Sequence, residues 1–384
     1  MDSQRCVGGL CTPRSSAVAL GEPVRDFQAV ETVLSSPDDM AEQLIVLVAQ
    51  PKGVGLKRYY LPDDRIASDD IDEELGAFRV DTAIRGTLQL AAANRDPTQG
   101  LMRFAWAQQS EGGGVRSVLL DIKTPWISAT ETLYKLPAAT TLSQLVTAKV
   151  PGGSLQGWVE AFGPNVRPFV QFVSEDGTTH LAQALDTNGY SIALAGDHER
   201  SVAYWLQRSG SWWGIWHRET PHGQLFDMDE PATLLIAGTG PGPSSIFAAN
   251  AKDRTLLFLD HASSLGTEAN KMVLVQQGGT QLVERNYTQG FDAIEQLRVV
   301  PAMSVGAWVA VVGEWGGERG IWLRHINEKG AVENYSIRVL DMPPMSRIDE
   351  LSVSEAVGAV QVSWAERVDA NSQRVLWTRS FACD

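Results

Sequence analysis

Short apolar runs alternate along this chain with clusters of glycine, proline, asparagine and aspartate, a pattern typical of strands joined by turns. One group of four runs predicts strands near residues 88–94, 101–108, 115–122 and 130–136. A later group predicts strands near residues 294–300, 306–315, 319–326 and 332–340. No repeat contains an i, i+3, i+4 apolar stripe long enough for a packed helix, so the pattern predicts an all-β protein.

A local motif recurs at a regular interval: a large apolar residue, then any residue, then Glu or Gln. The clear copies are Trp106 to Gln108, Trp158 to Glu160, Trp205 to Gln207, and Trp364 to Glu366. Weaker copies are Leu259 to His261, Val312 to Glu314, and a segment around Val48. Successive anchor residues, near 48, 106, 158, 205, 259, 312 and 364, are 47 to 58 residues apart. Such a period indicates a repeat architecture.

Four strands in a unit of about fifty residues resemble the blade of a β-propeller, in which radial repetition leaves only short protected edges. The resemblance is to the superfold and to no particular propeller family. It implies a single closed propeller of about seven four-stranded blades over residues 16–384, preceded by a tail at 1–15. A β-sandwich is the alternative, and it does not explain the period.

The last repeat lacks a strand. Strands are predicted near 348–354, 358–366 and 373–381, after which the sequence stops at residue 384. The apolar segment 16–24 can supply the outer strand of this last blade and so close the ring.

Three cysteines lie near the two ends of the chain: Cys6, Cys11 and Cys383. Closure of the ring predicts a disulfide between Cys383 and either Cys11 or Cys6, and the alternatives are a Cys6–Cys11 bridge or free thiols. A bridge indicates an oxidising compartment. No apolar signal segment follows Met1, so the sequence is that of a cytoplasmic protein or of a mature form. Because the cysteines lie only near the two ends, where a bridge would close the ring, we favour a mature periplasmic or secreted protein over a cytoplasmic one.

The chain is acidic, with a formal net charge of −14 and no basic stripe. This composition argues against nucleic acid as a partner, and the apolar runs are too short to cross a bilayer. We expect a soluble protein without a cofactor. Among the residues of an acidic run, Asp69, Asp70 and Asp72 are candidate calcium ligands, although a solvated loop is the favoured interpretation.

Two groups of side chains are candidates for binding. The polar residues that follow the anchors would form a ring on one face of the disc, unless each only bonds to a nearby turn. They are Gln108, Glu160, Gln207, His261, Glu314 and Glu366. The second group is Trp212, Trp213 and Trp216, of which at least one ring is expected at the surface to stack on a sugar or to anchor a protein. Packing of all three in the core is the alternative.

The sequence contains no serine nucleophile elbow and no metal-binding spacing of His or Cys. We therefore expect a non-catalytic binding or scaffold propeller that recognises a protein or a glycan through loops on one face. One alternative is a glycan-active hydrolase or lyase with carboxylates at the central mouth, for which Glu160, Glu314 and Glu366 are the candidates. The other alternative is a structural subunit of a larger assembly.

Overall fold

The structure is a computed structural model of the 384-residue chain. It describes residues 12–13, 17–19, 29–35, 43–50, 53–60, 88–96, 101–108, 113–121, 123, 126–128, 131–137, 140–196, 199–251, 254–260, 271–276, 280–302, 306–332, 336–342, 346–356, 359–367 and 374–382.

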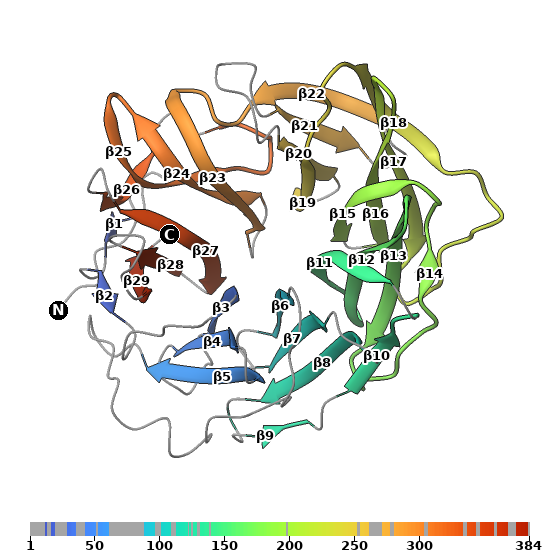
Figure 1. Cartoon of the computed structure of the whole chain (residues 1–384), viewed down its shortest axis with the longest axis horizontal. Helices are drawn as coiled ribbons and strands as arrows, with labels where there is room; N and C mark the ends of the chain where they lie inside the picture. Colours follow the sequence, from blue (N-terminus) through green and yellow to red (C-terminus); the bar gives the residue numbers. More distant parts are fainter. Residues whose placement is uncertain are drawn as a thin grey trace.

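Every regular element among these residues is a strand, and the strands form seven antiparallel sheets. Figure 1 shows the sheets arranged around a central axis, each with its first strand nearest the centre. The predicted all-β propeller is therefore confirmed. The expectation of about seven blades with four strands each remains a prediction, because the described part of the sheet nearest the N-terminus has three strands.

The sheets follow one another along the chain. The first contains β3 (Ala29–Ser35), β4 (Gln43–Gln50) and β5 (Gly53–Tyr60). The second contains β6 (Leu88–Asp96), β7 (Leu101–Gln108), β8 (Gly114–Asp121), β9 (Trp126–Ile127) and β10 (Glu131–Lys135). The third contains β11 (Thr141–Val150), β12 (Gly153–Phe162), β13 (Asn165–Ser174) and β14 (Gln183–Ala184). The fourth contains β15 (Gly189–Gly196), β16 (Arg200–Ser209), β17 (Trp212–Pro221) and β18 (Thr233–Thr239).

The remaining three sheets complete the ring. The fifth contains β19 (Ser245–Ala251), β20 (Arg254–Asp260), β21 (Lys271–Gln276) and β22 (Thr280–Asn286). The sixth contains β23 (Phe291–Pro301), β24 (Ala307–Trp315), β25 (Glu318–Ile326) and β26 (Ile337–Asp341). The seventh contains β27 (Arg347–Ala356), β28 (Ala359–Arg367) and β29 (Val375–Ala382), with β1 (Thr12–Pro13) and β2 (Val18–Ala19) paired to β29.

The core lies between neighbouring sheets, and the second strand of each sheet serves two such interfaces. On β16, Ala203 and Trp205 pack against the third sheet, whereas Tyr204 and Leu206 pack against the fifth. Successive side chains of a strand point to opposite faces, so a strand buried on both faces must be apolar at every position. This requirement explains why the anchor strands are near-continuous apolar runs.

The anchor tryptophans are inter-sheet core residues. Trp106, Trp158, Trp205 and Trp364 each lie on the second strand of their sheet and are at most 1% exposed. Val312 differs from them, because it packs toward the following sheet, whereas Val311 packs toward the preceding one as Trp205 does. The true counterpart of the tryptophans is thus Val311, one residue earlier than the sequence repeat indicated.

The N-terminal segment completes the last sheet from outside. Val18 and Ala19 pair with Thr378 and Trp377, which agrees with an outer strand drawn from residues 16–24. Thr12 and Pro13 also pair with this strand, so the sheet extends into the segment expected to be a tail. Cys6, Cys11 and Cys383 lie outside the described residues.

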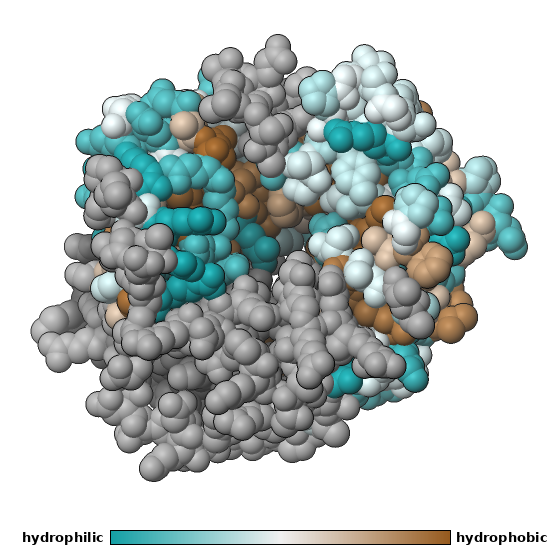
Figure 2. Space-filling model, viewed as in Figure 1, coloured by the Kyte–Doolittle hydropathy of each residue, from teal (hydrophilic) through white to brown (hydrophobic). Residues whose placement is uncertain are grey.

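The surface is hollowed at the centre of the ring, as Figure 2 shows in the same view as Figure 1. In the described part of the chain there is no helix with the length and apolar character to span a membrane.

Candidate functional site

The first strand of several sheets carries a β-bulge near its start, and the residue that follows the bulge faces the next sheet. The bulges lie between Leu142 and Gln144, Gly189 and Ser191, Ile294 and Gln296, and Ile348 and Glu350. A bulge inserts one residue and re-aims the side chains around it.

Two of these residues join their own sheet to the next. The amide of Gln144 donates to the carbonyl oxygen of Ile192 at 3.1 Å and accepts from the Ile192 N–H at 2.9 Å. The hydroxyl of Ser191 accepts from the N–H of Ile246 at 3.1 Å. A polar side chain at this register thus satisfies buried backbone groups on the inner strand of the neighbouring sheet.

Gln296 occupies the same register in the sixth sheet and makes no such bond. It pairs with Val312 on β24 as Gln144 pairs with Val159 on β12. Its Oε1 is buried and has no hydrogen-bond partner among the described residues. Buried polar atoms are nearly always bonded, so an unpartnered one needs an explanation.

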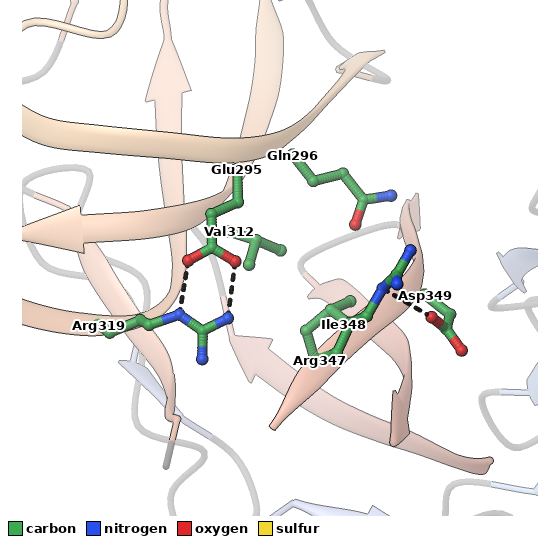
Figure 3. A pocket seen from close by; sticks show the side chains of 7 residues that line it. All are labelled: Glu295, Gln296, Val312, Arg319, Arg347, Ile348 and Asp349. Carbon is green, nitrogen blue, oxygen red and sulfur yellow. Dashed lines mark hydrogen bonds and ion pairs between the residues drawn. The ribbon is translucent and has the colours of Figure 1, made fainter. Parts of the chain in front are cut away.

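A cavity of about 490 Å³ lies beside Gln296, between β23 and β27. Its lining residues are Glu295, Gln296, Val312, Arg319, Arg347, Ile348 and Asp349 (Figure 3). Val312 and Ile348 belong to the core cluster shared by the sixth and seventh sheets, and they form the apolar part of the lining. The amide of Gln296 and the guanidinium of Arg347 point into the space between the two strands (Figure 3).

One wall of the cavity is an ion pair. The Nε and Nη2 atoms of Arg319 donate to the two carboxylate oxygens of Glu295 at 2.5 and 2.6 Å, and its Nη1 donates to the carbonyl of Ser346 at 2.9 Å. The hydrogen bonds from Arg319 lower the pKa of Glu295 below its ordinary value, and those to Glu295 raise the pKa of Arg319. Glu295 is the bulge residue, which places its carboxylate on this wall.

The opposite wall is built around Asp349, the bulge residue of β27. Its carboxylate is 9% exposed and is contacted by three arginines. One oxygen accepts from Nη2 of Arg367 at 2.6 Å and lies 2.8 Å from Nε of Arg374. The other lies 3.2 Å from Nε of Arg347, whose side chain is 80% exposed.

Two of the carboxylates expected from the sequence face this same interface. Glu366 lies on β28, two residues after Trp364 and on the same face of the strand. Trp364 packs toward the sixth sheet. Burial raises the pKa of the Glu366 carboxyl, and a hydrogen bond with Ser346 partly opposes the shift. Glu314 lies two residues after Val312, on the face of β24 that meets the seventh sheet.

Glu160 lies elsewhere, between the second and third sheets. Its Oε1 accepts a hydrogen bond from the indole N–H of Trp158 at 3.0 Å, and burial raises the pKa of the carboxyl. Burial and a hydrogen bond with Glu160 raise the pKa of Tyr134 to about 12. β12 and β28 are on opposite sides of the ring (Figure 1), so Glu160 and Glu366 belong to separate sites.

The three candidate tryptophans are half-buried, and two of them, Trp213 and Trp216, pack between sheets. Trp213 lies against Gly238 and Gly242, where an added Cβ would come within 2.5 and 2.6 Å of its ring. Trp216 packs against the core between the third and fourth sheets, and Trp212 covers Gly214. The geometry thus assigns these rings mainly to packing.

The remaining candidates contribute no described cluster. Gln108 pairs with Leu88 and Gly114 at the end of β7, and Gln207 is half-buried on β16. His261, Asp69, Asp70 and Asp72 lie outside the described residues. Within the part of the chain that the structure describes, no group of three or more His, Cys, Asp or Glu could hold a metal ion.

Sequence reasoning missed Gln296, Arg347 and Asp349. A signal was present for Gln296: glutamine stands at the equivalent inner-strand register in the second, third and sixth sheets, at Gln89, Gln144 and Gln296. Their distances to the anchor residues differ because the connecting hairpins and bulges differ, so the register becomes visible only once the strands are paired.

No protein-family model matches the chain, and no curated protein matches it either. Similar solved structures include a protein of unknown function from Dyadobacter fermentans DSM 18053, with TM-score 0.52, 10% identity, and coverage of 98% of this chain and 100% of that one. They also include the polysaccharide lyase Uly1, with TM-score 0.51, 11% identity, and coverage of 92% and 90%. An oligogalacturonate lyase in complex with manganese has TM-score 0.50, 9% identity, and coverage of 97% and 99%. At these identities the likeness shows the propeller fold alone.

Proposed function

We propose that this protein is a saccharide-binding propeller whose binding site is the cavity between β23 and β27. The observation that carries the proposal is the cavity itself, which is lined by the apolar side chains of Val312 and Ile348, by Gln296, whose Oε1 has no partner among the described residues, and by Arg347, which contacts Asp349 through Nε. Small-molecule sites are typically concave, largely apolar, and furnished with a few convergent polar groups.

The chemistry of a sugar ring suits this lining. One face of a pyranose presents C–H groups that can contact the edge of Ile348, while its rim of hydroxyl groups can donate to Gln296 Oε1 and accept from Arg347. A volume of about 490 Å³ falls within the usual range of ligand pockets, which is roughly 300–1,000 Å³. Two of the similarly folded structures are a polysaccharide lyase and an oligogalacturonate lyase, so a ring of this shape can accommodate saccharides.

The test is a screen of immobilised oligosaccharides followed by calorimetric titration of each sugar that binds. Gln296→Trp fills the cavity from β23 and should abolish binding. Gln224→Trp introduces the same change at an exposed turn position and should bind as the wild type does. Equal affinity in all three proteins, with unchanged thermal unfolding, would place saccharide binding outside this cavity and contradict the proposal.

A second candidate function is cleavage of the bound saccharide, and it is favoured by Glu366. Burial raises the pKa of this carboxyl, which faces the interface beside the cavity, and a raised pKa is one feature of carboxyls that act as general acids. Chromatography of the sugars after long incubation tests this function. Shortened products that disappear in Glu366→Gln would establish cleavage, whereas intact sugars leave the protein as a binding module.

A further inference from the structure

We infer that the saccharide taken by this cavity carries an anionic group, a carboxylate or a sulfate, and that Arg347 binds it. The inference rests on the proposed function and names its ligand class. It starts from a difference in hydrogen bonding between Arg319 and Arg347, the two arginines that line the cavity.

Arg319 is engaged through every nitrogen of its guanidinium. All three of its guanidinium nitrogens donate, two to Glu295 and one to the carbonyl of Ser346. Opposite charges thus cancel on that wall, and the bidentate geometry is the strongest form of an arginine–carboxylate pair. This arginine therefore holds the wall together and does not select a ligand.

Arg347 is in the opposite situation. Among the described residues its one ionic partner is Asp349, which it contacts through Nε at 3.2 Å. The same carboxylate also binds Arg367 and Arg374 at 2.6 and 2.8 Å, so Arg347 shares it with two arginines that lie closer. The two terminal nitrogens of Arg347 donate to no group among the described residues. The two terminal nitrogens of Arg347 form a planar pair of charged donors, and this pair can bind an external anion.

Gln296 supplies the complementary group. Its buried Oε1 accepts no hydrogen bond in the described structure, although Gln144 at the same register is fully bonded to the next sheet. A sugar hydroxyl next to the anionic group can donate to Oε1 while the anion binds Arg347. One ligand would then connect β23 with β27, in the place of the direct bond that Gln144 makes between the third and fourth sheets.

The positive charge of Arg347 is important for binding an anion because the chain as a whole is acidic. A net charge of −14 repels anions at long range, so an anionic sugar gains affinity only from groups it touches. Arg347 is on the cavity wall and exposed, which meets this condition.

The experiment compares matched ligands by calorimetry on the full chain: uronic-acid tri- to hexasaccharides, their methyl esters, the corresponding neutral hexose oligomers, and sulfated hexose oligomers. We expect the free acid to bind about ten- to hundredfold more tightly than its methyl ester, since a hydrogen bond to a charged group exceeds a neutral one by about this factor. Preference for the sulfated oligomer over the uronate would identify sulfate as the anion.

Two variants locate the effect. Arg347→Gln keeps hydrogen-bonding capacity without charge and should reduce the affinity for the acid to that for the ester. Arg200→Gln is the matched control, because Arg200 is exposed on β16 in a pair with Glu219, and it should leave the preference intact.

The outcomes separate the inference from the proposed function. Equal binding of acid, ester and neutral oligomer, abolished by Gln296→Trp, would overturn the anionic ligand and retain saccharide binding. An acid preference that persists in Arg347→Gln would overturn the role of Arg347. No binding of any oligosaccharide would overturn both proposals.

Discussion

His217 is a buried histidine, 4% exposed, whose ring stacks on Tyr204 and whose Nε2 has no hydrogen-bond partner among the described residues. Desolvation by burial lowers its pKa below the ordinary 6.5, and the nearby Glu219 only partly opposes this. Below pH 6.5 the unfolded chain therefore binds a proton that the folded chain resists. The free energy of unfolding should fall as the pH drops from 6.5 through the lowered pKa.

Urea denaturation between pH 7.5 and 5 checks this prediction. His217→Phe keeps an aromatic ring against Tyr204 and removes the titrating group, so it should flatten the pH dependence. The control for an added phenyl group is His180→Phe, because the ring of His180 also packs against an aromatic residue, edge-on to Phe172. This variant should retain the wild-type slope. An identical slope in wild type and His217→Phe would show that another group is responsible.

Gln144 and Gln296 share a register but differ in hydrogen bonding. Truncation of each side chain to alanine should therefore lower the free energy of unfolding by a different amount. Gln144→Ala leaves the N–H and carbonyl of the buried Ile192 without their side-chain partner, and it should destabilise the protein by about 1–3 kcal/mol. Gln296→Ala breaks no bond within the described residues, and its effect should stay within about 0.5 kcal/mol. Chemical denaturation of the two variants measures the difference, and equal losses would contradict it.

At the scale of elements, the short strands β1 and β2 cover the outer edge of β29. Without them the N–H and carbonyl groups of a strand that carries the buried Thr378 and Phe381 would be unpaired, and an open edge favours association with other chains. Deletion of residues 1–19 should therefore destabilise the protein by roughly 2–4 kcal/mol, at about 1 kcal/mol for each backbone hydrogen bond lost. It should also promote oligomers.

Thermal unfolding and size-exclusion chromatography test the deletion, both under reducing conditions so that a disulfide of Cys11 does not contribute to the difference. Removal of residues 1–10 only, which retains Thr12–Pro13 and Val18–Ala19, is the control and should behave as the full chain does. Equal melting temperatures and monomeric elution of both truncated forms would show that these pairings contribute nothing to closure.

The elements themselves were largely predictable. The strands expected near 101–108 and 319–326 are β7 at Leu101–Gln108 and β25 at Glu318–Ile326. The strand expected near 332–340 begins later, at Ile337, as β26. This outer strand is only partly buried, so a weaker apolar pattern marks its start than marks the second strands.

At the scale of the whole molecule, β1 and β29 discriminate between the two disulfides expected from the sequence. Thr12 pairs with Ala382 in antiparallel register, and Cys11 and Cys383 are the next residues outward in the two segments, outside the described residues. If this register continues by one residue, Cys11 would lie opposite Cys383, so we predict a Cys11–Cys383 bridge and an unpaired Cys6.

Peptide mapping of protein isolated from its native source under alkylating conditions tests the bridge. If it forms, reduction should lower the free energy of unfolding by about 2–5 kcal/mol, and Cys11→Ser should reproduce that loss while Cys6→Ser should not. A bridge would also support an extracytoplasmic location, since structural disulfides persist in oxidising compartments. Three alkylated thiols would contradict the prediction and its consequence for location.

The sequence by itself determined the all-β class, the repeat with its apolar anchor strands, and the use of an N-terminal segment to complete the last sheet. These features follow from local patterns, because a strand buried on both faces must be apolar throughout and a blade short of a strand must obtain one from elsewhere.

Only the tertiary structure revealed the cavity between β23 and β27. The bulges at Glu295 and Asp349 shift the inner strands by one residue, and a shift of one residue moves every side chain to the opposite face of its strand. Whether a glutamine at that register bonds to the next sheet, as Gln144 does, or opens onto a cavity, as Gln296 does, depends on the distance between two sheets. The alternation of side chains along a strand does not encode the distance between two sheets, because that distance arises from the packing of side chains across the whole interface.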